Sequence, residues 1–265
     1  MPYLSPALNV MVAAARKAGR GLIRDFGELE NLQVSRKGPA DFVSTADSRT
    51  EGILLEQLSR ARPGYPFLME ESGVIEGTDK THRFIVDPLD GTTNFLHGIP
   101  QFAISIALER EGVLVSAVVF NPVTDEMYSA ERGHGAYLNN RRLRVAARER
   151  LPDTVVATGT PFHGTGGFDE FSAELARVMP EVAGVRRFGS AALDLAFVAA
   201  GRFDAYWERD IAAWDVAAGI LIVREAGGVV SDLDGRDRML DAGHILAAND
   251  PLHRPLLDLI RGARR

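Results

Sequence analysis

Several carboxylate side chains stand where apolar stretches of the sequence stop. Asp87 and Asp90 follow the apolar run 84–86. Glu70 follows a second such run, and Asp215 stands where an apolar helix is expected to begin. Because a short apolar run bounded by turn residues is typical of a buried strand, we expect the first three acids at strand ends, where functional side chains gather.

Carboxylates that cluster would bind a hard divalent cation. Mg²⁺ prefers oxygen ligands and combines a few carboxylates with water and substrate phosphate, so convergence of these acids would create a metal site. Each acid also fits an ordinary structural role. The Asp-Gly pair at 90–91 is common in turns, and the dipole of a helix would favour Asp215 in its first turn. The residues alone leave both interpretations open.

The composition is that of a folded globular protein, and it removes several kinds of chemistry. The 265 residues are 46% hydrophobic and 25% charged, and none is cysteine, which excludes disulfides, thiolate nucleophiles and Cys-based metal sites. No P-loop, dinucleotide-binding glycine motif, serine-hydrolase elbow or zinc-protease motif occurs. The net charge of −6, without a basic tract, disfavours direct nucleic-acid binding but permits a small anionic ligand.

The same composition gives no sign of a membrane protein. No basic segment precedes an apolar stretch near the N-terminus, and no uninterrupted apolar run approaches the ~18 residues of a membrane span. We expect a soluble, cytoplasmic protein.

Apolar periodicity divides the chain into two kinds of structure. In the first half we expect a helix from Ser5-Pro6 and another from about Thr45, with Asp47 in its first turn, followed by a largely antiparallel sheet. In the second half strands and helices alternate, which is typical of α/β layers around a mixed sheet. The expected strands are 66–69, 83–86, 102–108, 113–120, 126–130, 154–158, 185–188, 205–207, 228–231 and 245–248, and the later helices are 168–178, 191–200, 213–225 and one from 251.

The length fits one large domain or two modest ones. No flexible Gly/Ser linker separates the halves. We predict one compact domain over 1–265, α/β overall with an α+β first half, and divided roughly into 1–148 and 149–265.

Four motifs follow one another along the chain: Asp41 to Asp47, Glu70-Glu71-Ser72, Ile85 to Phe95 and Trp214 to Gly219. Together and in this order they resemble the inositol monophosphatase family, specifically its bacterial inositol-1-monophosphatase-like members. The resemblance covers nearly the whole chain and implies an alternating αβαβα layered sandwich of the inositol monophosphatase and fructose-1,6-bisphosphatase type. One departure is Met69, where the family commonly has glycine.

The resemblance also implies a set of metal ligands. Glu70, Asp87 and the backbone carbonyl of Leu89 would hold one Mg²⁺ ion. Asp87 would bridge to a second ion, which Asp90 and Asp215 would complete. Glu70 would also take part in binding a third, weaker ion.

Further residues acquire catalytic or substrate-binding roles by the same resemblance. Asp47 and Thr92 would orient the attacking water, and Glu208 would accept hydrogen bonds from the ring hydroxyls of inositol. Asp194 lies in a segment that faces the substrate alcohol and varies between activities. The substrate-binding residues implied are Asp90, Gly91, Thr92, Gly189, Ser190, Ala191 and Glu208.

The implied reaction is Mg²⁺-dependent hydrolysis of a phosphate monoester by metal-activated water, with myo-inositol monophosphate as substrate. The resemblance implies a homodimer that lithium inhibits. The segment 36–46 is polar and contains a Gly-Pro pair, so we expect it to close over the site as a lid and to bring Lys37 near the phosphate. Histidinol phosphate and sugar or nucleotide phosphates remain alternative substrates. A regulatory protein-binding role in transcription or ribosome biogenesis is an alternative of another class.

Overall fold

The computed structural model describes residues 5–28, 34–36, 42–161, 164 and 166–262. Its helices follow the predicted periodicity closely. Ser5 caps the first helix as predicted, because its Oγ accepts the Leu8 N–H at 3.2 Å. The helices are α1 (Pro6–Phe26), α2 (Thr45–Ala61), α3 (Thr92–Leu96), α4 (Phe168–Val178), α5 (Ala191–Ala199), α6 (Ala213–Glu225), α7 (Met239–Ala242) and α8 (Asp250–Gly262), with 3₁₀ turns at Leu151–Asp153 and Met179–Glu181.

The first half of the chain forms an eight-stranded sheet in the order β10-β9-β8-β7-β6-β5-β3-β4. All neighbours are antiparallel except β3 and β5, which confirms a largely antiparallel sheet. Glu111 and Gly112, both with positive φ, form the tight turn predicted between β6 and β7. The strands are β3 (Phe67–Met69), β4 (Gly73–Ile75), β5 (His82–Asp90), β6 (Ala103–Arg110), β7 (Val113–Asn121), β8 (Glu126–Glu131), β9 (Gly135–Leu138) and β10 (Arg141–Arg142), and a separate hairpin pairs β1 (Val34–Arg36) with β2 (Phe42–Ser44).

The second half forms a five-stranded mixed sheet in the order β12-β11-β13-β15-β14. Strand β11 is parallel to both β12 and β13, whereas β15 is antiparallel to β13 and β14. The strands are β11 (Val155–Thr158), β12 (Gly184–Arg186), β13 (Ala205–Arg209), β14 (Val229–Ser231) and β15 (His244–Ala248).

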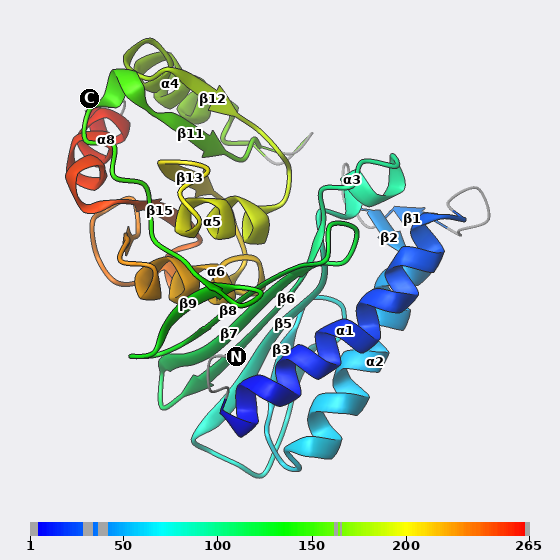
Figure 1. The fold of residues 1–265 in the computed structure, drawn as a ribbon. Helices are drawn as coiled ribbons and strands as arrows, with labels where there is room; N and C mark the ends of the chain where they lie inside the picture. Colours follow the sequence, from blue (N-terminus) through cyan, green and yellow to red (C-terminus); the bar gives the residue numbers. More distant parts are fainter. Residues whose placement is uncertain (1–4, 29–33, 37–41, 162–163, 165, 263–265) are drawn as a thin grey trace.

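Helices and sheets alternate in five layers, which confirms the predicted αβαβα sandwich (Figure 1). Helices α1 and α2 pack on one face of the eight-stranded sheet through an apolar cluster that includes Leu22, Leu54 and Phe84. Helices α5 and α6 fill the space between the two sheets, and α4 and α8 cover the far face of the five-stranded sheet. Alternation of side chains along β5 and β13 therefore sends successive residues into different layers.

Two local differences from the sequence prediction matter for function. Strand β5 continues to Asp90 instead of ending at Val86, and a short helix, α3, follows directly after Gly91.

The short elements β4, β9, β10 and α7 were not predicted, since two to four residues carry too little periodicity to detect. No helix among the described residues is long and apolar enough to span a membrane.

Candidate functional site

Asp87 and Asp90 leave β5 on the same face of the sheet because the strand carries a bulge between them. The two aspartates are three residues apart, but their partners on β6, Ser105 and Ala103, are only two apart. Since side chains alternate along a strand, the extra residue turns both aspartates toward α5 and α6. Pro88, which has no N–H to donate, lies in the bulge.

Asp215 reaches the same place from the first turn of α6. A hydrogen bond of 3.3 Å from Ser105 Oγ to the Trp214 carbonyl oxygen holds this turn against β6, beside Asp87. One carboxylate oxygen from each of Asp87, Asp90 and Asp215 lies within 4.8 Å of the others. The fold thus brings together three acids that lie as many as 128 positions apart in the sequence.

Backbone amides fix the orientation of two of these carboxylates. Oδ1 of Asp87 accepts the Leu89 N–H at 2.8 Å. Oδ2 of Asp215 accepts the Ala212 N–H, also at 2.8 Å. Such bonds to one oxygen hold a carboxylate in place for a ligand that binds the other.

Asp90 is anchored to the start of α5. Its Oδ2 accepts a hydrogen bond of 2.5 Å from Ser190 Oγ and one of 2.8 Å from the Ala192 N–H. Ser190 and the amide of Ala191, predicted to bind substrate, therefore also hold the Asp90 carboxylate. Gly189 precedes them with a φ of 79°, a left-handed conformation that favours glycine.

Burial and mutual repulsion raise the pKa values of the clustered acids. Burial, and next the charge of Asp47, raises the pKa of Glu70 to about 8. Burial raises the pKa of Asp90 to about 6, although its hydrogen bonds oppose the shift. The pKa values of Asp87 and Asp215 are also well above their ordinary value, first because of burial and then because of neighbouring carboxylates. Without a cation, this cluster holds protons at neutral pH.

Glu70 belongs to the same cluster. Its backbone N–H donates to the Val86 carbonyl oxygen at 3.3 Å, which places it beside Asp87 on the neighbouring strand. The charge of Glu70 also raises the pKa of Asp87, so the two carboxyl groups interact directly. Oε2 of Glu70 is buried without a hydrogen-bond partner. A buried carboxylate oxygen in that state is suited to a cation.

Asp47 and Thr92 approach the cluster from two different helices. Asp47, 1% exposed, lies in the first turn of α2 as predicted, and its charge acts on Glu70. Thr92, the first residue of α3, donates its hydroxyl hydrogen to the Leu89 carbonyl oxygen at 3.0 Å. The carbonyl predicted to bind metal thus already accepts one hydrogen bond.

The turn at Gly91 requires glycine, and Asn94 holds it in place. Gly91 has a φ of 94°, and an added Cβ would lie 2.8 Å from the Gln101 carbonyl oxygen. Nδ2 of Asn94, in α3, donates to the Gln101 oxygen at 2.8 Å and to the Phe188 oxygen at 2.7 Å. Asn94 therefore joins α3 to the segment that leads into α5. It was not predicted as a site residue, although it lies within the same motif.

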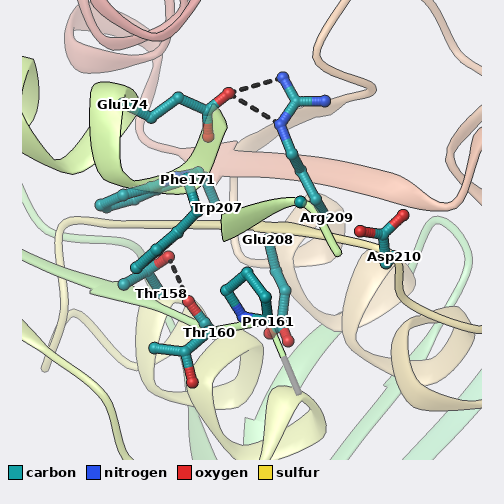
Figure 2. A pocket seen from close by; sticks show the side chains of 11 residues that line it. Thr158, Thr160, Pro161, Phe171, Glu174, Trp207, Glu208, Arg209 and Asp210 are labelled. Carbon is teal, nitrogen blue, oxygen red and sulfur yellow. Dashed lines mark hydrogen bonds and ion pairs between the residues drawn. The ribbon is translucent and has the colours of Figure 1, made fainter. Parts of the chain in front are cut away.

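Glu208 and Arg209, at the end of β13, point into different layers. Tyr206, two residues before Glu208, packs among the apolar residues around α5 and α6, so Glu208 faces the layer that contains Asp90. Burial raises the pKa of Glu208 to about 7. Figure 2 shows Arg209 turned instead toward α4, where it pairs with Glu174 at 2.6 Å. Glu208 thus lies in the layer of the acid cluster, and its role in accepting hydrogen bonds from substrate hydroxyls stays a prediction.

Glu51 is a further residue of the site that sequence reasoning missed. It lies one helical turn after Asp47 in α2 and is 4% exposed. Its Oε2 accepts the Glu71 N–H at 2.9 Å, and its Oε1 accepts the Ser72 hydroxyl. Glu51 thereby ties the loop that follows Glu70 to the helix that carries Asp47. The available signal was an acid within the apolar stripe of a helix.

Two other expectations concern the surroundings of the site. Met69, the one departure from the resemblance noted above, is fully buried in the layer of α1 and α2 and pairs with Val86 in regular strand geometry. Residues 37–41 of the predicted lid, with Lys37, lie outside the described part of the chain.

Five alternating layers with an acid cluster at the end of β5 define an α/β protein of the inositol monophosphatase and fructose-1,6-bisphosphatase fold. The chain belongs to the inositol monophosphatase family, whose family model matches residues 3–264. Membership confirms the predicted family and supports phosphatase activity of a metal-dependent type.

Individual relatives agree with this assignment. The chain is 61% identical over 257 residues to an inositol-1-monophosphatase of Mesorhizobium japonicum, covering 97% of each protein. It is 43% identical over 262 residues to the Nus factor SuhB of Pseudomonas aeruginosa, again covering 97% of each. The crystal structure of the extragenic suppressor protein suhB from Bartonella henselae superposes with a TM-score of 0.95, at 57% identity over 97% of this chain and 99% of that one.

Proposed function

We propose that this protein is a Mg²⁺-dependent inositol monophosphatase that hydrolyses myo-inositol monophosphate to inositol and phosphate. The observation that carries the proposal is the convergence of three carboxylate oxygens within 4.8 Å, beside Glu70 and in the same layer as Glu208. The cluster of acids, whose charge divalent ions would neutralise, thus lies in the same layer as Glu208, an acid that can accept hydrogen bonds from substrate hydroxyl groups.

The donor set fits Mg²⁺. All the proposed ligands are oxygens, the unpartnered Oε2 of Glu70 among them, and hard cations select oxygen. In this assignment Glu70, Asp87 and the Leu89 carbonyl would hold one ion, and Asp87, Asp90 and Asp215 would hold a second. When bound, such ions lower the pKa of water and stabilise the developing charge on the leaving oxygen.

The protein residues have separate tasks in the proposed reaction. Asp47 accepts the proton of the attacking water, and the Thr92 hydroxyl orients that water. The amides of Gly91 and Thr92 bind the phosphate, since N–H groups at the start of a helix attract anions. Asp90, Gly189, Ser190 and Ala191 line the side of the site where the substrate alcohol lies. No covalent nucleophile is required.

Glu208 selects a polyol in this proposal. A carboxylate accepts hydrogen bonds from hydroxyl groups, and those bonds are lost when a substrate has none. Replacement of Glu208 by glutamine is expected to lower kcat/KM for inositol monophosphate by about 10–100-fold, equivalent to ~1.5–3 kcal/mol for hydrogen bonds to a charged group.

The test is phosphate release from a panel of monoesters by the purified protein with Mg²⁺. Inositol monophosphate is expected to be the best substrate, ahead of histidinol phosphate, a hexose phosphate and a 3′-nucleotide. Glu208→Gln is expected to reduce this preference while leaving phenyl phosphate hydrolysis nearly unchanged. Glu181→Gln, at an exposed position beyond α4, is the control. Preference for another panel member would contradict the inositol assignment but not the phosphatase class.

A second candidate is a regulatory role as a protein-binding module in transcription, since one relative is named a Nus factor. A folded chain that binds no Mg²⁺ and releases no phosphate from any monoester would favour this role. The homodimer, the location in the cytoplasm and the single domain with halves 1–148 and 149–265 stay predictions. Light scattering tests the dimer.

A further inference from the structure

Gly159 provides the space in which the Glu208 carboxyl group lies. A Cβ added at Gly159 would stand 1.8 Å from both Cδ and Oε1 of Glu208, and 2.3 Å from Oε2. The two residues are neighbours because β11 and β13 are parallel, with Thr158 opposite Trp207. The Glu208 carboxyl group therefore lies directly against the backbone at the end of β11.

The backbone conformation does not explain the glycine. Gly159 is not among the glycines with a positive φ, so other residues can adopt its conformation. The atoms that an alanine would meet belong to the far end of the Glu208 side chain rather than to a backbone. What requires glycine at this position is the present location of the Glu208 carboxyl group.

One further contact holds the Glu208 carboxyl group, and another fixes the strand end that carries it. The Tyr206 hydroxyl donates a hydrogen bond to Oε2 of Glu208 from the same strand. On the opposite face of β13, Arg209 forms a buried ion pair with Glu174, which is fully buried in α4 (Figure 2). The strand end is thus fixed on one side, and the carboxyl group is supported on the other by Tyr206 and Gly159.

We propose that Gly159 is a specificity-determining position, because its missing side chain sets how far the Glu208 carboxyl group stands from the substrate. The inference rests on the proposed function, in which Glu208 reads substrate hydroxyls. A methyl group at 159 would move the carboxyl group by about 1 Å or more, since such contacts do not fall below 3.0 Å. Hydrogen bonds to substrate depend on that distance, whereas the metal ligands and the phosphate amides lie on other elements.

The experiment compares kcat and KM of Gly159→Ala and wild type for inositol monophosphate and for phenyl phosphate, which has no neighbouring hydroxyls. We expect kcat/KM for inositol monophosphate to fall about tenfold or more, and the value for phenyl phosphate to change less than about twofold. The dependence on Mg²⁺ is expected to be unchanged. Gly21→Ala in α1, where an added Cβ meets nothing within 4 Å, is the matched control.

A double-mutant cycle tests whether residue 159 acts through Glu208. Glu208→Gln alone tests the proposed function, and the double variant is expected to lose no more selectivity than Glu208→Gln, because both changes affect one interaction. Tyr206→Phe removes one hydroxyl from the same support and is expected to give a selective loss of the same kind. It also keeps the proposal testable if Gly159→Ala is poorly folded.

The outcomes of these measurements distinguish the proposed role of Gly159 from the proposed function of the protein. Selective loss in Gly159→Ala or Tyr206→Phe, non-additive with Glu208→Gln, supports the proposal. A selective loss in Glu208→Gln alone would overturn the role of Gly159 and leave the proposed function standing. Equal losses on both substrates would show a structural effect and also overturn it. No selective loss in Glu208→Gln would overturn both the substrate-reading role of Glu208 and the inference built on it.

Discussion

Binding of Mg²⁺ is expected to release protons from the acid cluster, and the amount can be worked out from the site. Burial, and next the charge of Asp47, raises the pKa of Glu70 to about 8. At pH 7 a carboxyl with that pKa is about 90% protonated, whereas a carboxylate that binds metal carries no proton. Asp90, with a pKa of about 6, contributes about a tenth of a proton more at that pH.

We therefore expect release of at least about one proton at pH 7, and an apparent Kd for Mg²⁺ that falls about tenfold per pH unit between pH 6 and 7. Well above pH 8 the acids are ionised before metal arrives, so the dependence levels off. Isothermal titration calorimetry in buffers with different heats of ionisation measures the proton count directly. Glu70→Gln is expected to lower it by about 0.9 proton, and Glu181→Gln to leave it unchanged.

The same shifts predict the sign of a stability change in metal-free protein. The folded-state pKa of Glu70 is raised from 4.5 to about 8, so its protonated form favours the folded state. This contribution is fully present below about pH 4.5 and is lost as pH rises through 8. The Tm without metal is expected to fall between pH 6 and 8, and Mg²⁺ to restore more stability at pH 8 than at pH 6. Binding without proton release at pH 7, or a Kd that is independent of pH, would refute the reasoning.

Further predictions concern single residues of the site. Asp87→Asn removes charge from both proposed ion sites, so turnover is expected to be nearly abolished with circular dichroism unchanged; wild-type kcat at saturating Mg²⁺ would argue against a bridging role. Glu51→Gln is expected to raise the Mg²⁺ concentration for half-maximal activity about tenfold, as is usual when a residue that orients ligands is changed. Glu56→Gln, on the exposed side of α2, controls for the helix, and equal behaviour of the two variants would remove Glu51 from the site. Li⁺ is expected to inhibit uncompetitively and Asp215→Asn to blunt the effect, whereas insensitivity at about 50 mM Li⁺ would contradict the second ion site.

Long periodic segments were predictable from the sequence alone. Helices 168–178 and 213–225 begin and end where predicted, because their apolar residues repeat over three or more turns. The four acids at element ends were also recognisable locally, since each follows or begins an apolar run. Their convergence was not, because it depends on which strands become neighbours.

The features that were missed depend on partners distant in sequence. Pro88 and the Asp-Gly pair indicate a turn, yet β5 continues past Pro88 to Asp90 because Ser105 and Ala103 pair with it across a bulge. Glu51 is an acid in an apolar stripe, but its partners in the loop after Glu70 follow only from the fold. The need for glycine at 159 becomes visible only once β11 lies beside β13.

Anomalous diffraction from crystals loaded with Mn²⁺, which takes oxygen ligands as Mg²⁺ does, tests the acid cluster most directly. The account predicts anomalous peaks in contact with Asp87, one shared with Glu70 and one shared with Asp90 and Asp215. Full occupancy elsewhere on the protein, with no peak beside Asp87, would contradict the assignment of this cluster as the metal site of the phosphatase.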